Sequence, residues 1–450
     1  MKSRDKGRFP HSPNSTRVRP DAISRPLRCI ASRRARKRVP AALLVLAMLF
    51  GDTGLESARG AVTFAPFATG GVQYDSNLFM LPSFFPGFAR RGITNLSDSV
   101  ADYSAGFTSV VDFGAQRLSL DGTGTGFAYD RFSYLDHYEY NFGGELDWQL
   151  GPVVSGDVAY RQTRVMAPFM DTLSLDLFLD TERTAKATVS VLMSPKWRLS
   201  LTPEFHQLIT PLPGFVDFKL QENIGTAALD YLGFGKLTAG VLFDYDRGRY
   251  SDIVAATRYN QRDADATASY HVDKLSTFSA SAGYTIRDTQ PNAVDAVLPA
   301  AAGAGVFAQY AGAIGTTAAV TGSLSYQRQL TGKTSASVSL LRAVESYLAG
   351  ANPVIATGGE VKVTWKPDVK FTVDADYSLT RDQVQGGLVI ANIIGEDERT
   401  QVADLSVRYA VLSWLSIRPY FTWSRATSTF SLGNYSQTIV GVEVSGKPQF

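Results

Sequence analysis

The residues best suited to acid–base or metal chemistry in this sequence are its histidines and the carboxylates near them. Beyond residue 60 the histidines are His137, His206 and His271. Asp136 and His137 are adjacent, but adjacent side chains on an extended strand point to opposite faces, so the two are poorly placed to orient one another. His206 falls on the same face as Glu204, and His271 lies beside a turn. Isolated histidines of this kind are more often solvated than catalytic.

No spacing in the sequence is typical of a catalytic triad or a metal site. No serine is placed next to a histidine with a supporting carboxylate, and no ligand pattern for a metal is present. The single cysteine, Cys29, lies in a segment that we expect to be removed, which excludes disulfides and a cysteine nucleophile from the mature chain. We therefore expect no enzymatic activity, no cofactor and no bound metal. An outer-membrane enzyme is the alternative.

A second set of candidates consists of charges that alternate with apolar residues. If the apolar positions face lipid, the positions between them face a lumen. Twelve acidic against five basic residues at those positions predict a lumen that attracts cations and disfavours anions. The alternative is that the carboxylates pair with the arginines and keep the wall hydrated. The acidic residues are Asp102, Glu145, Asp147, Asp157, Glu204, Asp244, Asp246, Asp263, Asp265, Asp374, Asp376 and Asp404, and the basic ones are Arg161, Arg198, Arg287, Arg408 and Arg418.

These assignments depend on strands, and the sequence after residue 60 is a succession of them. Apolar and polar residues alternate with period 2 in segments of about 11–16 residues, a length typical of strands in membrane barrels. In residues 371–380 the apolar set is Phe371, Val373, Ala375, Tyr377 and Leu379, with polar residues between them. Such a strand has one apolar and one polar face.

The connections between these segments alternate between short and long. Eight short turns and nine longer segments reproduce the periplasmic turns and extracellular loops of an outer-membrane barrel. They predict an all-β, antiparallel, up-and-down transmembrane β-barrel of about 18 strands, or of 16 or 20 if one weak strand is misassigned. A soluble β-sandwich is the alternative fold. The short turns are at Gly114-Ala115, Gly151-Pro152, Ser194-Pro195, Phe234-Gly235, Asp273-Lys274, Thr331-Gly332, Pro367-Asp368 and Leu412-Ser413.

Aromatic residues and the carboxyl end favour the membrane barrel. Tryptophans occupy the apolar face at both ends of their strands, as in aromatic girdles. Alternate valines and a terminal phenylalanine resemble the signal that the barrel-insertion machinery recognises. We expect the outer membrane of a Gram-negative bacterium, with its lipid and the insertion machinery as partners and without nucleic acid. The residues are Trp148, Trp197, Trp365 and Trp423 for the girdles, and Val440, Val442, Val444 and Phe450 for the signal.

The first 60 residues predict a signal peptide with a long basic n-region. They hold 14 Lys+Arg and 4 Asp+Glu, which leaves 30 basic and 38 acidic residues in 61–450. Basic residues up to Arg38 precede an apolar run at 41–50, and small residues at Ala58 and Gly60 precede Ala61. We expect cleavage at this point, with 61–450 forming the outer-membrane β-barrel. A basic nucleic-acid-binding tail is the alternative.

Four motifs near the start of the mature chain resemble a known family. They are similar to the type-two β-barrel porins and, within these, to the EpsL group of outer-membrane proteins from exosortase-linked exopolysaccharide operons. The resemblance implies a part in the biosynthesis or export of an extracellular polysaccharide, with polysaccharide and other export proteins as partners. Met80 stands where members often carry a basic residue, a departure that weakens a ligand role there. The motifs are Tyr74-Asp75-Ser76-Asn77-Leu78-Phe79-Met80-Leu81-Pro82, Asp130-Arg131-Phe132, Leu135-Asp136 and Leu146-Asp147-Trp148-Gln149-Leu150-Gly151.

The function predicted from these features is an outer-membrane channel or porin-like barrel in polysaccharide export. The alternatives are a general cation-preferring diffusion porin and a non-conducting scaffold. Segment 75–97, with its four phenylalanines, is too apolar for a freely solvated loop, so we expect it to fold inward or to pack on the barrel rim. Five tyrosines fit either a path for sugars or an interfacial belt; they are Tyr129, Tyr134, Tyr138, Tyr140 and Tyr420.

Overall fold

The predicted strands are present, and they close into a barrel. The computed structural model describes residues 62–169, 174–211, 217–251, 257–291, 315–346, 353–385, 397–429 and 433–448. Its strands are β1 (Val62–Asp75), β2 (Asp98–Phe113), β3 (Gln116–Tyr129), β4 (His137–Leu150), β5 (Val154–Met166), β6 (Leu179–Ser194), β7 (Trp197–Thr210), β8 (Phe218–Phe234), β9 (Leu237–Ser251), β10 (Thr257–His271), β11 (Ser276–Pro291), β12 (Gly315–Thr331), β13 (Thr334–Ser346), β14 (Pro353–Asp368), β15 (Phe371–Val384), β16 (Asp397–Ala410), β17 (Leu415–Ser428) and β18 (Tyr435–Gly446). Each strand pairs antiparallel with its sequence neighbours, and β1 also pairs with β18, so the sheet has no free edge.

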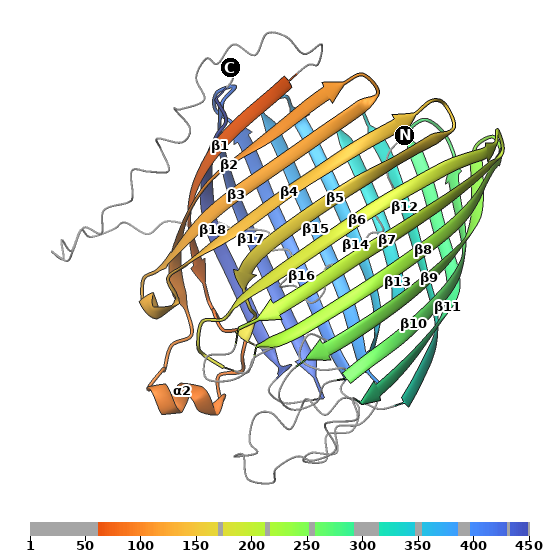
Figure 1. Cartoon of the computed structure of the whole chain (residues 1–450). Coiled ribbons are helices and arrows are strands. Elements are labelled where there is room, and N and C mark those ends of the chain that lie inside the picture. Colours follow the sequence, from red (N-terminus) through yellow and green to blue (C-terminus); the bar gives the residue numbers. More distant parts are fainter. Residues whose placement is uncertain are drawn as a thin grey trace.

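The predicted strand number and turn positions are confirmed. The sheet has 18 strands, and each short connection lies at or within two residues of its predicted position. The turn after β14 falls at Val369 and Lys370, slightly beyond the prediction, because β14 continues to Asp368 through a register shift. In Figure 1 the short turns lie at the upper end of the tilted strands, and the helix α2 (Pro86–Arg91) lies at the opposite end.

The pairing register decides which residues share a face of the wall. Residues directly opposite each other on antiparallel strands project to the same side. Phe243 opposes Ala264, which opposes Tyr284, which opposes Val320. Phe243, Tyr284 and Val320 are 49%, 48% and 65% exposed. An apolar row this exposed requires lipid rather than water beside it, so this is the outer face, and the alternate residues face the lumen.

A closed barrel with an apolar outer belt is the form in which β-strands cross a bacterial outer membrane. The protein is therefore an outer-membrane protein of a Gram-negative bacterium. The tryptophans near the short turns fit this placement, since Trp197 and Trp365 are 42% and 49% exposed. Val442 opposes Val72 on the outer face. The expected signal peptide at 1–60 and Phe450 lie outside the described residues.

No helix among the described residues is long and apolar enough to cross a membrane.

The apolar segment 75–97 packs on the barrel rim, one of its two expected positions. Phe79 is fully buried, and its ring centroid lies 5.4 Å from that of Phe88, 4.9 Å from Phe132 and 4.8 Å from Phe169. We call the buried group the rim cluster; it joins the three loops after β1, β3 and β5 to the ends of β2, β3 and β5. Its members are Leu78, Phe79, Leu81, Phe88, Val100, Phe127, Tyr129, Phe132, Leu135, Met166, Phe169 and Leu175.

A surface ion pair reinforces the same loops. The Arg91 guanidinium at the end of α2 lies 2.7 Å from the Asp176 carboxylate in the loop after β5. The hydrogen bond from Arg91 holds the pKa of Asp176 below its ordinary value. Both side chains are substantially exposed, so the ion pair contributes less to the stability of these loops than the buried rim cluster does.

Replacing Phe79 by alanine should loosen the rim cluster without opening the barrel. Truncating a fully buried phenylalanine costs about 3–5 kcal/mol. Here that loss of stability falls on the packing of the loops rather than on the barrel. We expect faster protease cleavage within 76–97, while the heat-dependent gel mobility of the folded barrel persists. Phe84→Ala is the matched control, because Phe84 belongs to the same segment and is 62% exposed. Equal cleavage of both variants and the parent would contradict the prediction.

Candidate functional site in the lumen wall

All seventeen predicted charged positions fall on the face opposite the outer belt. On β10, for example, Asp263 and Asp265 alternate with Ala264 and Ala266, which oppose the outer residues Phe243 and Val241. The positions are Asp102 on β2, Glu145 and Asp147 on β4, Asp157 and Arg161 on β5, Arg198 and Glu204 on β7, Asp244 and Asp246 on β9, Asp263 and Asp265 on β10, Arg287 on β11, Asp374 and Asp376 on β15, Asp404 and Arg408 on β16, and Arg418 on β17.

Three of the five arginines pair with carboxylates outside the predicted set. Arg161 lies 3.0 Å from Asp121, and Arg198 lies 2.6 Å from Asp230. Arg418 lies 3.7 Å from Glu443. These positive charges are thus offset by additional acidic residues, which leaves the wall acidic.

Several charged residues of the lumen wall are absent from the predicted set, and the alternation pattern explains two of the omissions. Asp230 lies between Leu229 and Tyr231, so strict alternation along β8 would have found it. Asp121 was obscured because its strand presents mainly glycine on the outer face. The Tyr103 ring covers one of these glycines, Gly126, and a Cβ added there would lie 2.4 Å from that ring. Lys362, another missed residue, lies 2.8 Å from Asp376.

Among the predicted positions, carboxylates lie directly opposite one another at three places in the lumen wall. Like charges in this arrangement destabilise a sheet by about 0.2–1 kcal/mol per pair. In the third pair, the Lys362 ammonium lies 2.8 Å from the Asp376 carboxylate. The opposed pairs are Asp147 with Asp157, Asp244 with Asp263, and Asp376 with Asp404.

Threonines on neighbouring strands hydrogen-bond to four of the predicted lumen carboxylates. Each threonine is directly opposite its aspartate and donates its hydroxyl hydrogen to a carboxylate oxygen. A hydroxyl donor stabilises an ionised carboxylate without cancelling its charge. These contacts therefore preserve the negative wall. The pairs are Thr226 with Asp244, Thr285 with Asp263, Thr364 with Asp374, and Thr422 with Asp404.

His206 lies in a buried polar cluster in the extracellular half of the wall. Its Nδ1 is 2.5 Å from Glu222 Oε2, and its Nε2 is 3.0 Å from Glu182 Oε1. Tyr259 donates to the same Glu222 carboxylate, and the Arg287 guanidinium carbon lies 3.5 Å from the Tyr259 ring centroid. Arg287 is only 1% exposed, so its charge is withdrawn from the lumen surface.

The histidine partners differ from those suggested by sequence proximity. The expected neighbour of His206, Glu204, lies two residues away on the same strand, whereas Glu222 is directly opposite on β8. At the rim, His137 Nδ1 donates to the Leu135 carbonyl at 2.7 Å. The adjacent Asp136 instead accepts the Tyr129 N–H at 2.9 Å. The described residues contain no group of three or more His, Cys, Asp or Glu arranged to hold a metal ion.

The motif Tyr74–Phe79 lies at the seam where the first strand meets the last. Asp75 Oδ1 accepts the Asn77 N–H at 2.8 Å, and its Oδ2 accepts a hydrogen from Gln437 Nε2 at 2.8 Å. The Ser76 N–H donates to the Thr438 carbonyl at 2.9 Å, and Ser76 Oγ accepts the Thr438 N–H at 2.7 Å. The last two motif residues belong to the rim cluster. This geometry joins β1 to β18 and starts the following loop.

Two of the five tyrosines favour the interfacial-belt interpretation, whereas Tyr420 lies on the lumen face. Tyr138 and Tyr140 alternate along β4 with lumen positions and lie on the outer face. The Tyr138 hydroxyl is 3.1 Å from that of Tyr103 on the same face. Tyr129 is buried in the rim cluster, which removes it from any lumen path.

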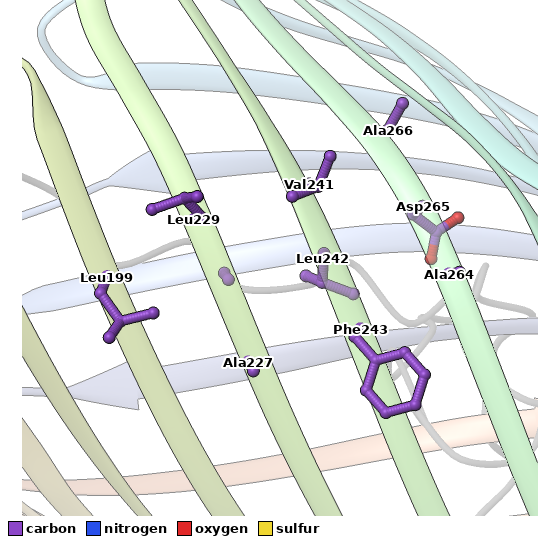
Figure 2. Close-up of a pocket in the computed structure, with 10 residues that line it drawn as sticks. Leu199, Ala227, Leu229, Val241, Leu242, Phe243, Ala264, Asp265 and Ala266 are labelled. Carbon is purple, nitrogen blue, oxygen red and sulfur yellow. The ribbon is translucent and has the colours of Figure 1, made fainter.

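A shallow hollow of about 490 Å³ lies on the outer wall over β7 to β10. Figure 2 shows Leu229, Val241 and Phe243 around it, with the short side chains of Ala227 and Ala266 leaving the space between them. Because Leu199, Leu229, Val241 and Phe243 belong to the outer belt, we assign this hollow to the lipid-facing surface rather than to the lumen site.

Comparison with known proteins gives only distant structural likenesses. No family model matches the chain, and no curated protein matches it. OpdK of Pseudomonas aeruginosa, solved with vanillate, is 12% identical with a TM-score of 0.42, over 86% of this chain and 98% of that one. The copper transporter OprC is 10% identical with a TM-score of 0.46, over 82% of this chain and 63% of that one. Likenesses this weak carry no conclusion about solutes.

Single cysteines should separate the two faces of β10 chemically. The segment 61–450 has no native cysteine, so each introduced thiol is unique. We expect Asp265→Cys to react with a charged, water-soluble thiol reagent in reconstituted barrels, because a wall lined with carboxylates attracts water. Ala264→Cys, the adjacent outer position, should be protected by lipid. Labelling is read by mass, and the reverse order of reactivity would refute the assignment of faces.

Proposed function

We propose that this protein is a water-filled outer-membrane channel that conducts small solutes and prefers cations. The observation that carries the proposal is the direct opposition of Asp244 and Asp263 on the lumen face, each hydrogen-bonded by a threonine. A sheet retains opposed like charges at a cost in stability. In a channel, these carboxylates would raise the local concentration of cations, which explains why both charges are present.

The barrel size and the distribution of charge support this proposal. Barrels of about 16–18 strands enclose an aqueous channel unless a loop fills it. Charge of one sign along a wall with a low-dielectric surround raises the local concentration of counter-ions. The lumen arginines with carboxylate partners add little positive potential, and Arg287 is buried.

We also propose that the channel serves the export of an extracellular polysaccharide, together with other export proteins. The motif Tyr74–Phe79 and its companions support this role through their resemblance to the exopolysaccharide-operon barrels. The charge of the lumen suits a neutral or cation-accompanied polymer better than free anions. A barrel that only scaffolds an export complex would share the motif but would not conduct.

Removing the opposed charges should reduce cation preference. In planar bilayers with a KCl gradient, we expect the parent protein to give a cation-selective reversal potential. Asp244→Asn with Asp263→Asn should move that potential toward zero, because two lumen charges are lost while side-chain volume is kept. Asp288→Asn is the matched control: Asp288 also accepts a hydrogen bond from a directly opposite threonine, Thr316, at 2.7 Å, but on the outer face. Anion selectivity of the parent would refute the channel proposal.

Deletion of the gene should abolish export of the polymer while leaving its synthesis intact. Exported and retained polysaccharide are measured separately. The control is the deletion strain in which a plasmid restores the gene. Loss of export together with conductance of the purified protein supports a conducting role. Loss of export with a protein that never conducts would favour the scaffold, and unchanged export would refute the polysaccharide role.

A further inference from the structure

The outer face changes chemistry along β9 and β10 as the strands approach the long loops. On β9 the outward residues Val241, Phe243 and Tyr245 are 58%, 49% and 40% exposed, and the next outward residues are Arg247 and Arg249. The distance from Leu237 to Arg247 is about 33 Å along a strand, or roughly 25 Å along the membrane normal at a tilt near 40°. The arginines thus begin where the hydrocarbon ends, on the extracellular side.

Six polar residues form one continuous row across this part of the outer face. Each is directly opposite the next in the pairing register. Adjacent strands are about 4.8 Å apart, so the row extends roughly 24 Å around the barrel. We call it the polar row; its members are Arg183 on β6, Gln207 on β7, Gln221 on β8, Arg249 on β9, Arg258 on β10 and Gln290 on β11.

The two central arginines of the polar row oppose one another directly. Arg249 and Arg258 are both exposed, and their juxtaposition on one face is unfavourable unless an anion lies between them. In the described part of the chain, no carboxylate forms an ion pair with either arginine, whereas the lumen residues Arg161 and Arg198 each have one. Arg247, one step closer to the hydrocarbon, opposes Asn223 and Asn260 and extends the same surface.

We propose that the polar row binds a phosphorylated glycolipid of the outer leaflet. Guanidinium groups bind phosphate oxygens in a bidentate manner. The flanking glutamine and asparagine amides supply donors and acceptors for sugar hydroxyls, and the apolar residues below accept acyl chains. A lipid fits better than soluble phosphate because the row lies directly above the lipid-facing belt on the same strands. This site is separate from the lumen and does not depend on the channel proposal.

Native mass spectrometry of the purified full barrel with added bis-phosphorylated lipid A tests the proposal. We expect Arg249→Gln with Arg258→Gln to weaken lipid A binding about 30-fold, since each basic residue near a headgroup contributes about a fivefold factor. Arg249→Lys with Arg258→Lys keeps the charge and should retain most of the binding. Arg328→Gln with Lys274→Gln removes the same charge near the short turns and should leave binding unchanged.

Two further measurements distinguish a lipid headgroup from free phosphate as the ligand. Dephosphorylated lipid A should bind as weakly to the parent as lipid A binds to the Gln double variant. Inorganic phosphate at equal concentration should not displace lipid A. Folding of each variant is verified by heat-dependent gel mobility. Undiminished binding of lipid A to the Gln double variant, equal loss in the Arg328 and Lys274 control, or displacement by inorganic phosphate would overturn the proposal.

Discussion

Backbone hydrogen bonding in hydrocarbon is the constraint on which this structure depends. An unpaired N–H or C=O group in lipid costs several kcal/mol, and water is absent to satisfy it. Seventeen consecutive strand pairs leave two edges, and the pairing of β1 with β18 removes both. The contacts of Asp75 and Ser76 with Gln437 and Thr438 of β18 extend that seam past the end of β1, to the start of the loop that contributes to the rim cluster.

Closure also couples the two surfaces of the wall. With every strand in register, one alternation assigns each residue either to lipid or to the lumen, and a shift of one residue would exchange the two sets. The acidic wall and the apolar belt are therefore consequences of the same pairing. Phe243 and Asp244 are adjacent in the chain, yet one meets acyl chains and the other meets water.

Opposed like charges occur on both surfaces, at different heights and with opposite sign. Inside, Asp244 opposes Asp263, and each carboxylate is hydrogen-bonded by a threonine. Outside, Arg249 opposes Arg258 next to glutamine amides. Both arrangements reduce the stability of the isolated sheet. Mobile cations in the lumen and anionic headgroups at the membrane surface are the environments in which these charges are compensated.

The sequence by itself determined the strands, the turns and the alternation of charged and apolar positions, because a period of two is a local property that needs no knowledge of neighbours. The tertiary structure alone decided which charges meet. It gave His206 the partner Glu222 rather than Glu204, gave Arg161 the partner Asp121, and set Asp244 against Asp263. It also placed segment 75–97 on the rim through contacts with loops distant in sequence. These partners lie on other strands, and the register between strands is fixed by pairing around the whole barrel rather than by any single segment.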